Sequence, residues 1–131
     1  MVSKKNPGRR RITQEDISYA PIPDELKQAI IPILNEQWVE KIIPKARDTL
    51  RLSYEIEGVY VTLYQERSGI KDKPGWHRSF VARIKYFDQA KVWFTQYSDI
   101  DGKWQDYNKL QPTKKFNKII EEINEDPYWV F

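Results

Sequence analysis

The chain has 131 residues, a net charge of +3, a hydrophobic fraction of 40% and a charged fraction of 31%. These values fit one folded domain that can bury a core without disulfides or metal. The sequence contains no cysteine, which excludes disulfides, zinc ribbons, iron–sulfur clusters and cysteine nucleophiles. No window approaches the roughly 20 apolar residues of a membrane span, so we expect a cytoplasmic protein with no membrane partner.

The first 23 residues show no hydrophobic period and include three prolines. They are also the most basic part of the chain, with Arg9, Arg10 and Arg11 following two lysines. We therefore predict a flexible basic leader over residues 1–23 and a single domain over residues 24–131. The leader is either a solubilising tail or an arm that lies along phosphates.

Two segments carry the apolar spacing of amphipathic helices. The first follows Asp24 and extends to Ile43, and Pro32 inside it predicts a kinked or split helix. The second begins after Thr113, a plausible cap, and ends at Asp126. The apolar tail at residues 128–131 is expected to pack back onto the domain or onto a second chain.

Between these helices the period changes from 3.6 to 2, which indicates strands. Five strands are predicted, separated by short turns or by the loop at residues 68–75, and they cover approximately residues 49–57, 59–67, 77–86, 91–97 and 103–107. The expected fold class is α+β, with a five-stranded antiparallel meander flanked by the N-terminal and C-terminal helices.

The alternation also predicts the two faces of the sheet. Leu50, Val61, Phe80, Ile84 and Phe94 are expected to face the helices. The opposite face would then carry Arg51, Tyr60, Tyr64, Arg83, Lys85, Trp93 and Tyr97. Aromatic rings beside cations are the composition of a surface that stacks bases and holds phosphates. The same composition also stabilises an exposed sheet with no ligand, and a terminal segment could cover this face.

The sequence offers little for catalysis. His77 is the only histidine, and no Gly-rich phosphate loop occurs. The acidic group at Asp99, Asp101 and Asp106 lacks the spacing of a calcium loop and is better explained as hairpin-turn chemistry. We therefore expect no enzyme activity, no metal and no cofactor.

A set of motifs in the last 80 or so residues resembles the domain of unknown function 3024 family, a group of small uncharacterised bacterial proteins. The residues that carry the resemblance are the strand Leu52–Tyr54, Leu63 with Arg67, Val81–Tyr86, Trp93, Asp99 followed by Lys103, Trp104 and Tyr107, and Asp126 with Phe131. The resemblance implies no reaction, cofactor or catalytic residue.

Two functional hypotheses follow from the sequence. The first is a non-enzymatic accessory protein that binds single-stranded nucleic acid. It would stack bases on Tyr60, Tyr64, Trp93 and Tyr97 and hold phosphates with Arg83, Lys85 and the arm at Arg9, Arg10 and Arg11. The second is a protein-interaction or assembly module, homo-oligomeric or hetero-oligomeric, with the apolar tail or an aromatic patch as its contact surface.

Overall fold

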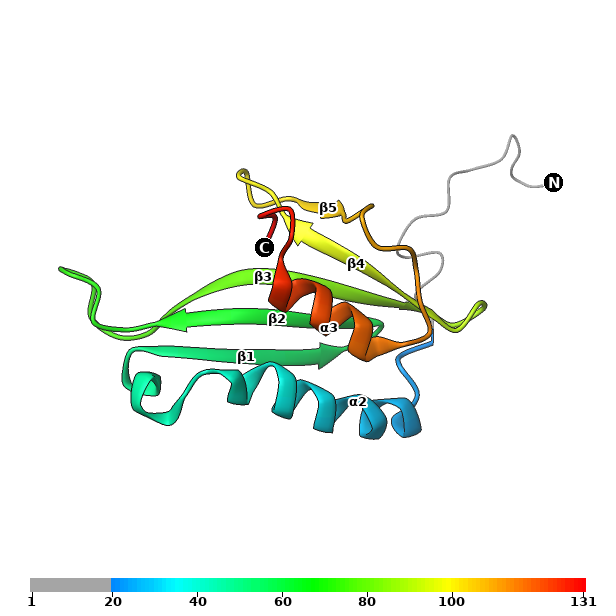
Figure 1. Ribbon diagram of the computed structural model, residues 1–131, viewed down its shortest axis with the longest axis horizontal. Coiled ribbons are helices and arrows are strands. Elements are labelled where there is room, and N and C mark those ends of the chain that lie inside the picture. Colours follow the sequence, from blue (N-terminus) through cyan, green and yellow to red (C-terminus); the bar gives the residue numbers. More distant parts are fainter. Residues whose placement is uncertain (1–19) are drawn as a thin grey trace.

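The computed structural model describes residues 20–131, and it has the α+β architecture that the sequence predicts (Figure 1). The helical elements are α2 (Asp24–Gln37), the short 3-10 helices η1 (Val39–Lys41) and η2 (Pro44–Asp48), and α3 (Phe116–Glu125). The strands are β1 (Leu50–Glu57), β2 (Tyr60–Arg67), β3 (His77–Phe87), β4 (Val92–Ser98) and β5 (Trp104–Asp106). They form one antiparallel sheet in the order β1-β2-β3-β4-β5, which confirms the predicted meander.

Tight turns set the register of the sheet. Gly58 adopts a φ of 61° between β1 and β2, a conformation that glycine reaches without steric cost. Between β4 and β5, the carboxylate of Asp99 accepts hydrogen bonds from the backbone N–H groups of Asp101 and Lys103, both at 2.9 Å. The structure thus assigns Asp99 to turn geometry, as the sequence predicts.

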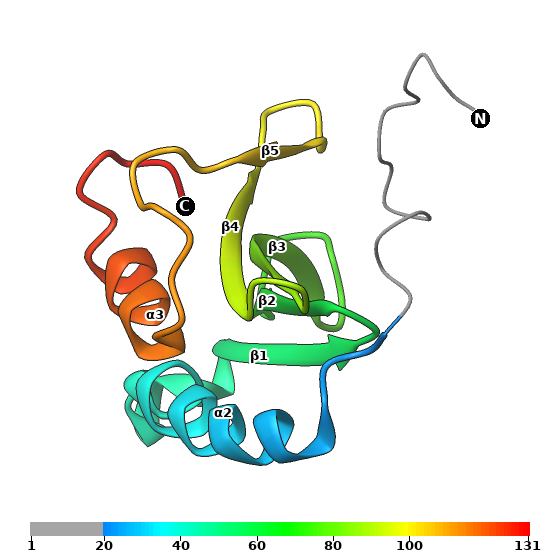
Figure 2. The same cartoon turned by 90° about the vertical axis from the view of Figure 1, so that its right-hand side faces the viewer.

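Both helices lie on the same side of the sheet (Figure 2). They cover a core made of the inward residues of β1 to β4 and the apolar stripes of α2 and α3, and this core includes Ile30, Leu34, Val61, Ile84, Trp93 and Ile119. Ile22 is also buried there, and its N–H donates to the carbonyl of Gly58 at 2.9 Å. The folded domain therefore includes Ile22, a residue that the sequence analysis assigned to the leader.

The N-terminal helix is continuous through Pro32, so of the two predicted alternatives, a kink or a split at that residue, the split does not occur. It ends at Gln37, so the helical segment that was expected to reach Ile43 is shorter, with η1 in its last part and η2 after it. The indole of Trp38 anchors this end of the helix, because its Nε1 donates to the carbonyl of Ser53 on β1 at 2.9 Å. A buried Trp with a satisfied N–H fixes the position of α2 relative to the sheet.

The last helix begins at Phe116, with Lys115 rather than Thr113 at its cap position. Asp126 ends it in the left-handed conformation, with a φ of 42°. The Asp126 carboxylate then accepts hydrogen bonds from the N–H groups of Val130 at 2.6 Å and Phe131 at 3.2 Å. The tail therefore folds back, and Phe131 packs against the core as predicted.

Within residues 20–131, no helix is both long enough and apolar enough to cross a membrane.

Candidate functional site

The sheet face opposite the helices is the candidate site, and we call it the open face. Residues paired directly across antiparallel strands share a face, so the register identifies its members. They are Arg51, Ser53, Glu55 and Glu57 on β1; Tyr60, Thr62, Tyr64 and Glu66 on β2; Arg78, Phe80, Arg83, Lys85 and Phe87 on β3; Val92, Phe94, Gln96 and Ser98 on β4; and Trp104 and Asp106 on β5. The structure therefore brings together four of the predicted site residues: Tyr60, Tyr64, Arg83 and Lys85.

Two predicted site residues lie on the helix side instead. Trp93 pairs with Tyr86, is 1% exposed and packs edge-on against Phe116 at 4.9 Å between ring centroids. Tyr97 pairs with Ala82, which is fully buried beneath the helices. The prediction that Trp93 and Tyr97 form a stacking surface on the open face is therefore wrong.

The pairing of β3 with β4 explains why Trp93 points inward. Phe87 pairs with Val92 across a four-residue connection, so Tyr86 faces Trp93 and Lys85 faces Phe94. Since Tyr86 shares the inward face of Ile84, its partner Trp93 must also point inward. The inward orientation of Trp93 could have been inferred from the sequence, because the number of residues between the two strands determines which side chains pair.

Phe80 and Phe94, which were expected in the core, occupy the open face instead. A β-bulge explains Phe80: Leu63 pairs with Ala82 and Tyr64 pairs with Phe80, so Val81 is an extra residue. Phe80 is consequently 52% exposed, and Phe94 is 37% exposed. The rings of Phe80 and Trp104 lie 5.3 Å apart, which extends the aromatic surface onto β5.

Arg83 lies at the centre of this surface between two rings. Its guanidinium carbon is 4.2 Å from the centroid of Tyr60 and 4.6 Å from that of Trp104. Its Nε donates to Oε1 of Gln96 at 3.0 Å, and Nε2 of Gln96 donates to Oδ1 of Asp106 at 3.1 Å. Burial lowers the pKa of Arg83 and raises the pKa of the Tyr60 phenol, although guanidinium groups in proteins stay charged.

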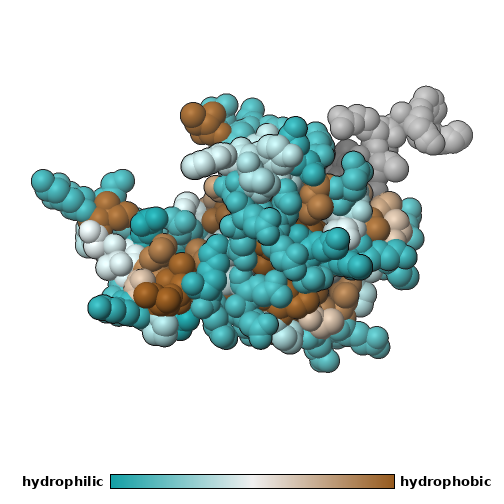
Figure 3. Space-filling view, viewed as in Figure 1, coloured by the Kyte–Doolittle hydropathy of each residue, from teal (hydrophilic) through white to brown (hydrophobic). Residues whose placement is uncertain are grey.

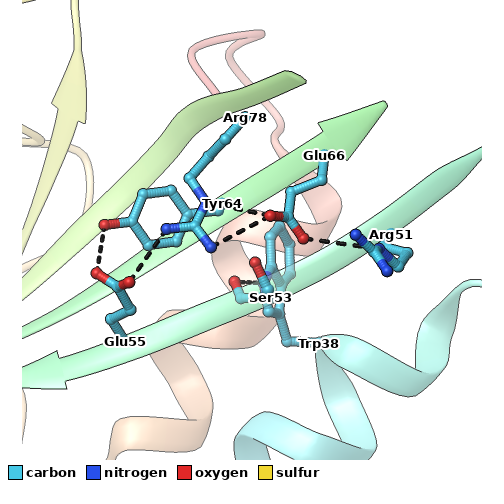
Figure 4. Close-up of polar contacts among 7 residues, drawn as sticks. All are labelled: Trp38, Arg51, Ser53, Glu55, Tyr64, Glu66 and Arg78. Atoms are coloured by element: carbon cyan, nitrogen blue, oxygen red, sulfur yellow. Dashed lines mark hydrogen bonds and ion pairs between the residues drawn. The ribbon is translucent and has the colours of Figure 1, made fainter. Parts of the chain in front are cut away.

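A second arginine is held by acidic groups nearer to β1 (Figure 4). The guanidinium of Arg78 lies 4.2 Å from the ring of Tyr64 and forms ion pairs with Glu55 at 3.1 Å and Glu66 at 3.2 Å. The Tyr64 phenol donates to Glu55 at 2.8 Å. Hydrogen bonds from Tyr64 and Arg78 lower the pKa of the Glu55 carboxyl. Because Tyr64 is 7% exposed and Arg78 lies over its ring, Tyr64 offers little free surface to a base.

The open face thus has two halves of different character. The β1–β2 half holds most of the acidic groups, Glu55, Glu57 and Glu66, together with Arg51, and Arg78 of β3 reaches across to pair with Glu55 and Glu66. The β3–β5 half holds the exposed rings Phe80 and Phe94 and the half-buried ring of Trp104 beside Arg83 and Lys85, with Asp106 as its acidic residue. An anionic ligand would therefore be favoured on the β3–β5 half.

The β3–β5 half also contains a shallow hollow of about 260 Å³, lined by Lys85, Phe87, Phe94, Gln96 and Asp106. Burial is the main cause that lowers the pKa of Lys85; the charge of Arg83 adds to it and that of Asp106 opposes it. The hollow therefore combines a cation, Lys85, and a carboxylate, Asp106, with the rings of Phe87 and Phe94.

The histidine and the acidic side chains are the other candidate groups that the structure places. His77 is exposed, and its Nε2 lies 3.3 Å from the carbonyl of Lys73. In residues 20–131 no group of three or more His, Asp or Glu side chains is arranged to hold a metal ion. Arg9, Arg10 and Arg11 lie outside the described residues.

Comparison with known families assigns the chain to one of them. A family model described as Domain of unknown function (DUF3024) matches residues 22–131, which is most of the chain. The protein therefore belongs to this family, as the sequence motifs indicated. No curated protein and no solved structure gives a significant match.

Proposed function

We propose that this member of the DUF3024 family is a non-enzymatic protein that binds single-stranded nucleic acid through the β3–β5 half of its open face. The observation that supports the proposal is the pair of exposed rings, Phe80 and Phe94, beside Lys85 and the half-buried ring of Trp104 on a sheet face that neither helix covers. Stacking on such rings contributes ~1–3 kcal/mol for each base and does not require a particular sequence.

The cations of the same half would attract the strand. Lys85 pairs directly with Phe94, so its ammonium adds positive charge next to the ring on which a base would stack. Arg83 is already held by Tyr60, Trp104 and Gln96, and it contributes positive potential from a fixed position. In this proposal the basic residues Arg9, Arg10 and Arg11 add long-range attraction, and the protein acts in the cytoplasm.

A titration with fluorescent oligonucleotides tests the proposal. Labelled oligothymidine and its duplex with oligoadenine would be titrated with the protein at low and at high salt. We expect the single strand to bind more tightly and its log K to fall with log salt, by about 0.7 for each phosphate contacted. No binding to either form at low salt would contradict the proposal.

Substitutions on the open face locate the interaction. Phe80→Ala combined with Phe94→Ala should weaken single-strand binding about five-fold or more for each base that loses its stacking partner. Trp129→Ala is a matched control, because Trp129 is an exposed aromatic residue of the tail rather than of the sheet. If the double variant and Trp129→Ala bound the single strand with equal affinity, Phe80 and Phe94 would not be the residues that stack bases.

A second function, protein interaction, has its own supporting observation. The tail folds back through Phe131 but leaves Trp129 92% exposed and Tyr128 55% exposed. Exposed Trp and Tyr side chains are enriched in the energetic centres of protein interfaces. On the side of the molecule shown in Figure 3, the hydrophobic areas are small and separate, so any such contact there would be local.

Light scattering coupled to size-exclusion chromatography distinguishes self-association from the first proposal. A dimer that becomes monomeric in Trp129→Ala, with a mass that salt does not change, would support an assembly role. A monomer at all concentrations, with salt-dependent oligonucleotide binding, would support the first function and count against self-assembly.

A further inference from the structure

The hollow on the β3–β5 half has the size and shape of a site for one ring system. Its volume of about 260 Å³ lies just below the range of pockets that hold drug-sized ligands. Phe87 and Phe94 form its apolar part, with their rings edge to face at 6.2 Å between centroids. A planar base entering the hollow would therefore contact the exposed surface of Phe94.

The polar wall of the hollow is held in place before any ligand arrives. Arg83 donates to Oε1 of Gln96, and Nε2 of Gln96 donates to Oδ1 of Asp106. This chain of hydrogen bonds orients the Asp106 carboxylate. Among the described residues no side chain donates to Oδ2 of Asp106, and Oδ1 keeps a second lone pair beside its bond to Gln96, so both oxygens can accept from a ligand.

Lys85 supplies the complementary group. Its side chain lines the same hollow, and its ammonium makes no ion pair within 4.0 Å among the residues described. The hollow therefore offers a carboxylate acceptor and an ammonium donor beside one aromatic surface. A ligand that satisfies both must present hydrogen-bond donors next to an acceptor on one planar edge.

Among the nucleic-acid bases, guanine has the edge that fits this arrangement. Its N1–H and N2–H groups are adjacent donors that a carboxylate accepts together, and its O6 is an acceptor for an ammonium. In thymine the single N3–H donor lies between two carbonyl oxygens, which a carboxylate repels. Adenine and cytosine each have one amino group beside a ring nitrogen that is an acceptor, so each can donate to the carboxylate only once.

We infer that the hollow binds one guanine base of a single strand, with Asp106 accepting from N1–H and N2–H, Lys85 donating to O6 and Phe94 stacking on the ring. This inference rests on the proposed nucleic-acid function and specifies which base the open face selects. Bases taken out of a stack are commonly read in this way, by hydrogen bonds to one edge and stacking on an aromatic side chain.

The test compares oligothymidines that carry one central substitution, guanine, inosine, adenine or cytosine, in the fluorescence titration at low salt. A guanine should strengthen binding about five-fold or more relative to thymine, the usual discrimination of a bidentate contact. Inosine, which lacks the N2 amino group, should lose part of this gain. In Asp106→Asn the preference should disappear, because the new amide N–H₂ would face the donors of guanine.

Asp101→Asn is the matched control, because it removes the same charge from an exposed residue of the β4–β5 turn, outside the hollow. It should keep the guanine preference. Equal affinity for all four substituted strands would overturn the inference and leave the proposed function intact. A guanine preference that survives in Asp106→Asn would also overturn it. No binding to any strand would overturn both proposals.

Discussion

The phenol of Tyr107, immediately after β5, donates a hydrogen bond to the carboxylate of Glu122 on α3. Tyr107 is 4% exposed, and its ring also packs against Phe131 at 4.9 Å between centroids. This contact links the last strand, the last helix and the tail. It connects segments that are remote in sequence, so it depends on the complete fold.

Removing the Tyr107 hydroxyl should therefore destabilise the domain. We expect Tyr107→Phe to lower the free energy of unfolding by ~1.5–3 kcal/mol, because it leaves a partly buried carboxylate without its donor. Urea denaturation measures this change. Tyr128→Phe is the control, since Tyr128 is 55% exposed, and it should be nearly neutral. Equal losses in both variants would contradict the role of the hydrogen bond.

The buried phenol of Tyr107 should also make the stability of the domain fall at alkaline pH. Burial, followed by the hydrogen bond to Glu122, raises the pKa of Tyr107 above its ordinary value of 10.0. A raised pKa in the folded state means that the stabilisation is complete below about pH 10 and is lost as the pH rises toward the folded-state pKa. The urea midpoint should fall more steeply above about pH 10 in the wild type than in Tyr107→Phe. Parallel slopes would contradict this prediction.

Two adjacent aromatic residues of β4 should respond differently to truncation. Trp93 is 1% exposed and contacts Tyr86 and Phe116, so Trp93→Ala should cost ~3–5 kcal/mol of unfolding free energy. Phe94 is 37% exposed on the open face, and Phe94→Ala should cost about 1 kcal/mol or less. Denaturant titration of both variants checks the assignment of faces. A larger loss for Phe94→Ala would show that the faces are reversed.

The loss of stability at acidic pH should depend on Glu55. Hydrogen bonds from Tyr64 and Arg78 lower the pKa of this carboxyl below its ordinary value of 4.5. A depressed pKa gives a stabilisation that is present above the unfolded-state pKa and is lost as the pH falls through the folded-state pKa. Glu55→Gln should therefore flatten the fall of the melting temperature below about pH 4.5. Glu57→Gln, on the same strand, serves as the control, because Glu57 makes no side-chain hydrogen bond or ion pair among the described residues, and an equal flattening in both variants would contradict the role of Glu55.

Asp126 should hold the C-terminal tail, residues 128–131, in its folded position. Its carboxylate accepts from the N–H groups of Val130 and Phe131, and its backbone is left-handed. Asp126→Ala loses these hydrogen bonds and places a methyl group in a conformation that favours Gly, Asn and Asp. We expect a loss of ~1–3 kcal/mol and faster digestion by carboxypeptidase. Asp126→Asn tolerates the conformation and keeps an acceptor oxygen, so its tail should resist digestion better.

The fold was largely predictable from local patterns. Period-2 segments bounded by Gly58 and by the Asp99 turn specified the meander, and the apolar stripe from Phe116 to Ile123 specified the last helix. The end of the first helix was not predictable in this way. The apolar spacing continues past Gln37, while the observed end depends on the indole of Trp38 reaching β1.

The candidate site was only half predictable. Tyr60, Tyr64, Arg83 and Lys85 share a face, as their alternation indicated, whereas Phe80 and Phe94 exchanged faces with Trp93 and Tyr97 relative to the prediction. Both strands carry large apolar residues on both faces, so the alternation alone did not say which set is buried. The bulge at Val81 and the pairing of Tyr86 with Trp93 decided it.

The sequence by itself determined the number and order of the elements, because hydrophobic periods and turn residues act over a few neighbours along the chain. The tertiary structure decided which aromatic rings meet solvent, because a shift of one residue in strand pairing moves every side chain to the other face. It also brought Arg83, Gln96 and Asp106 from three strands into one hydrogen-bonded row beside Phe94, and that arrangement depends on register rather than on composition.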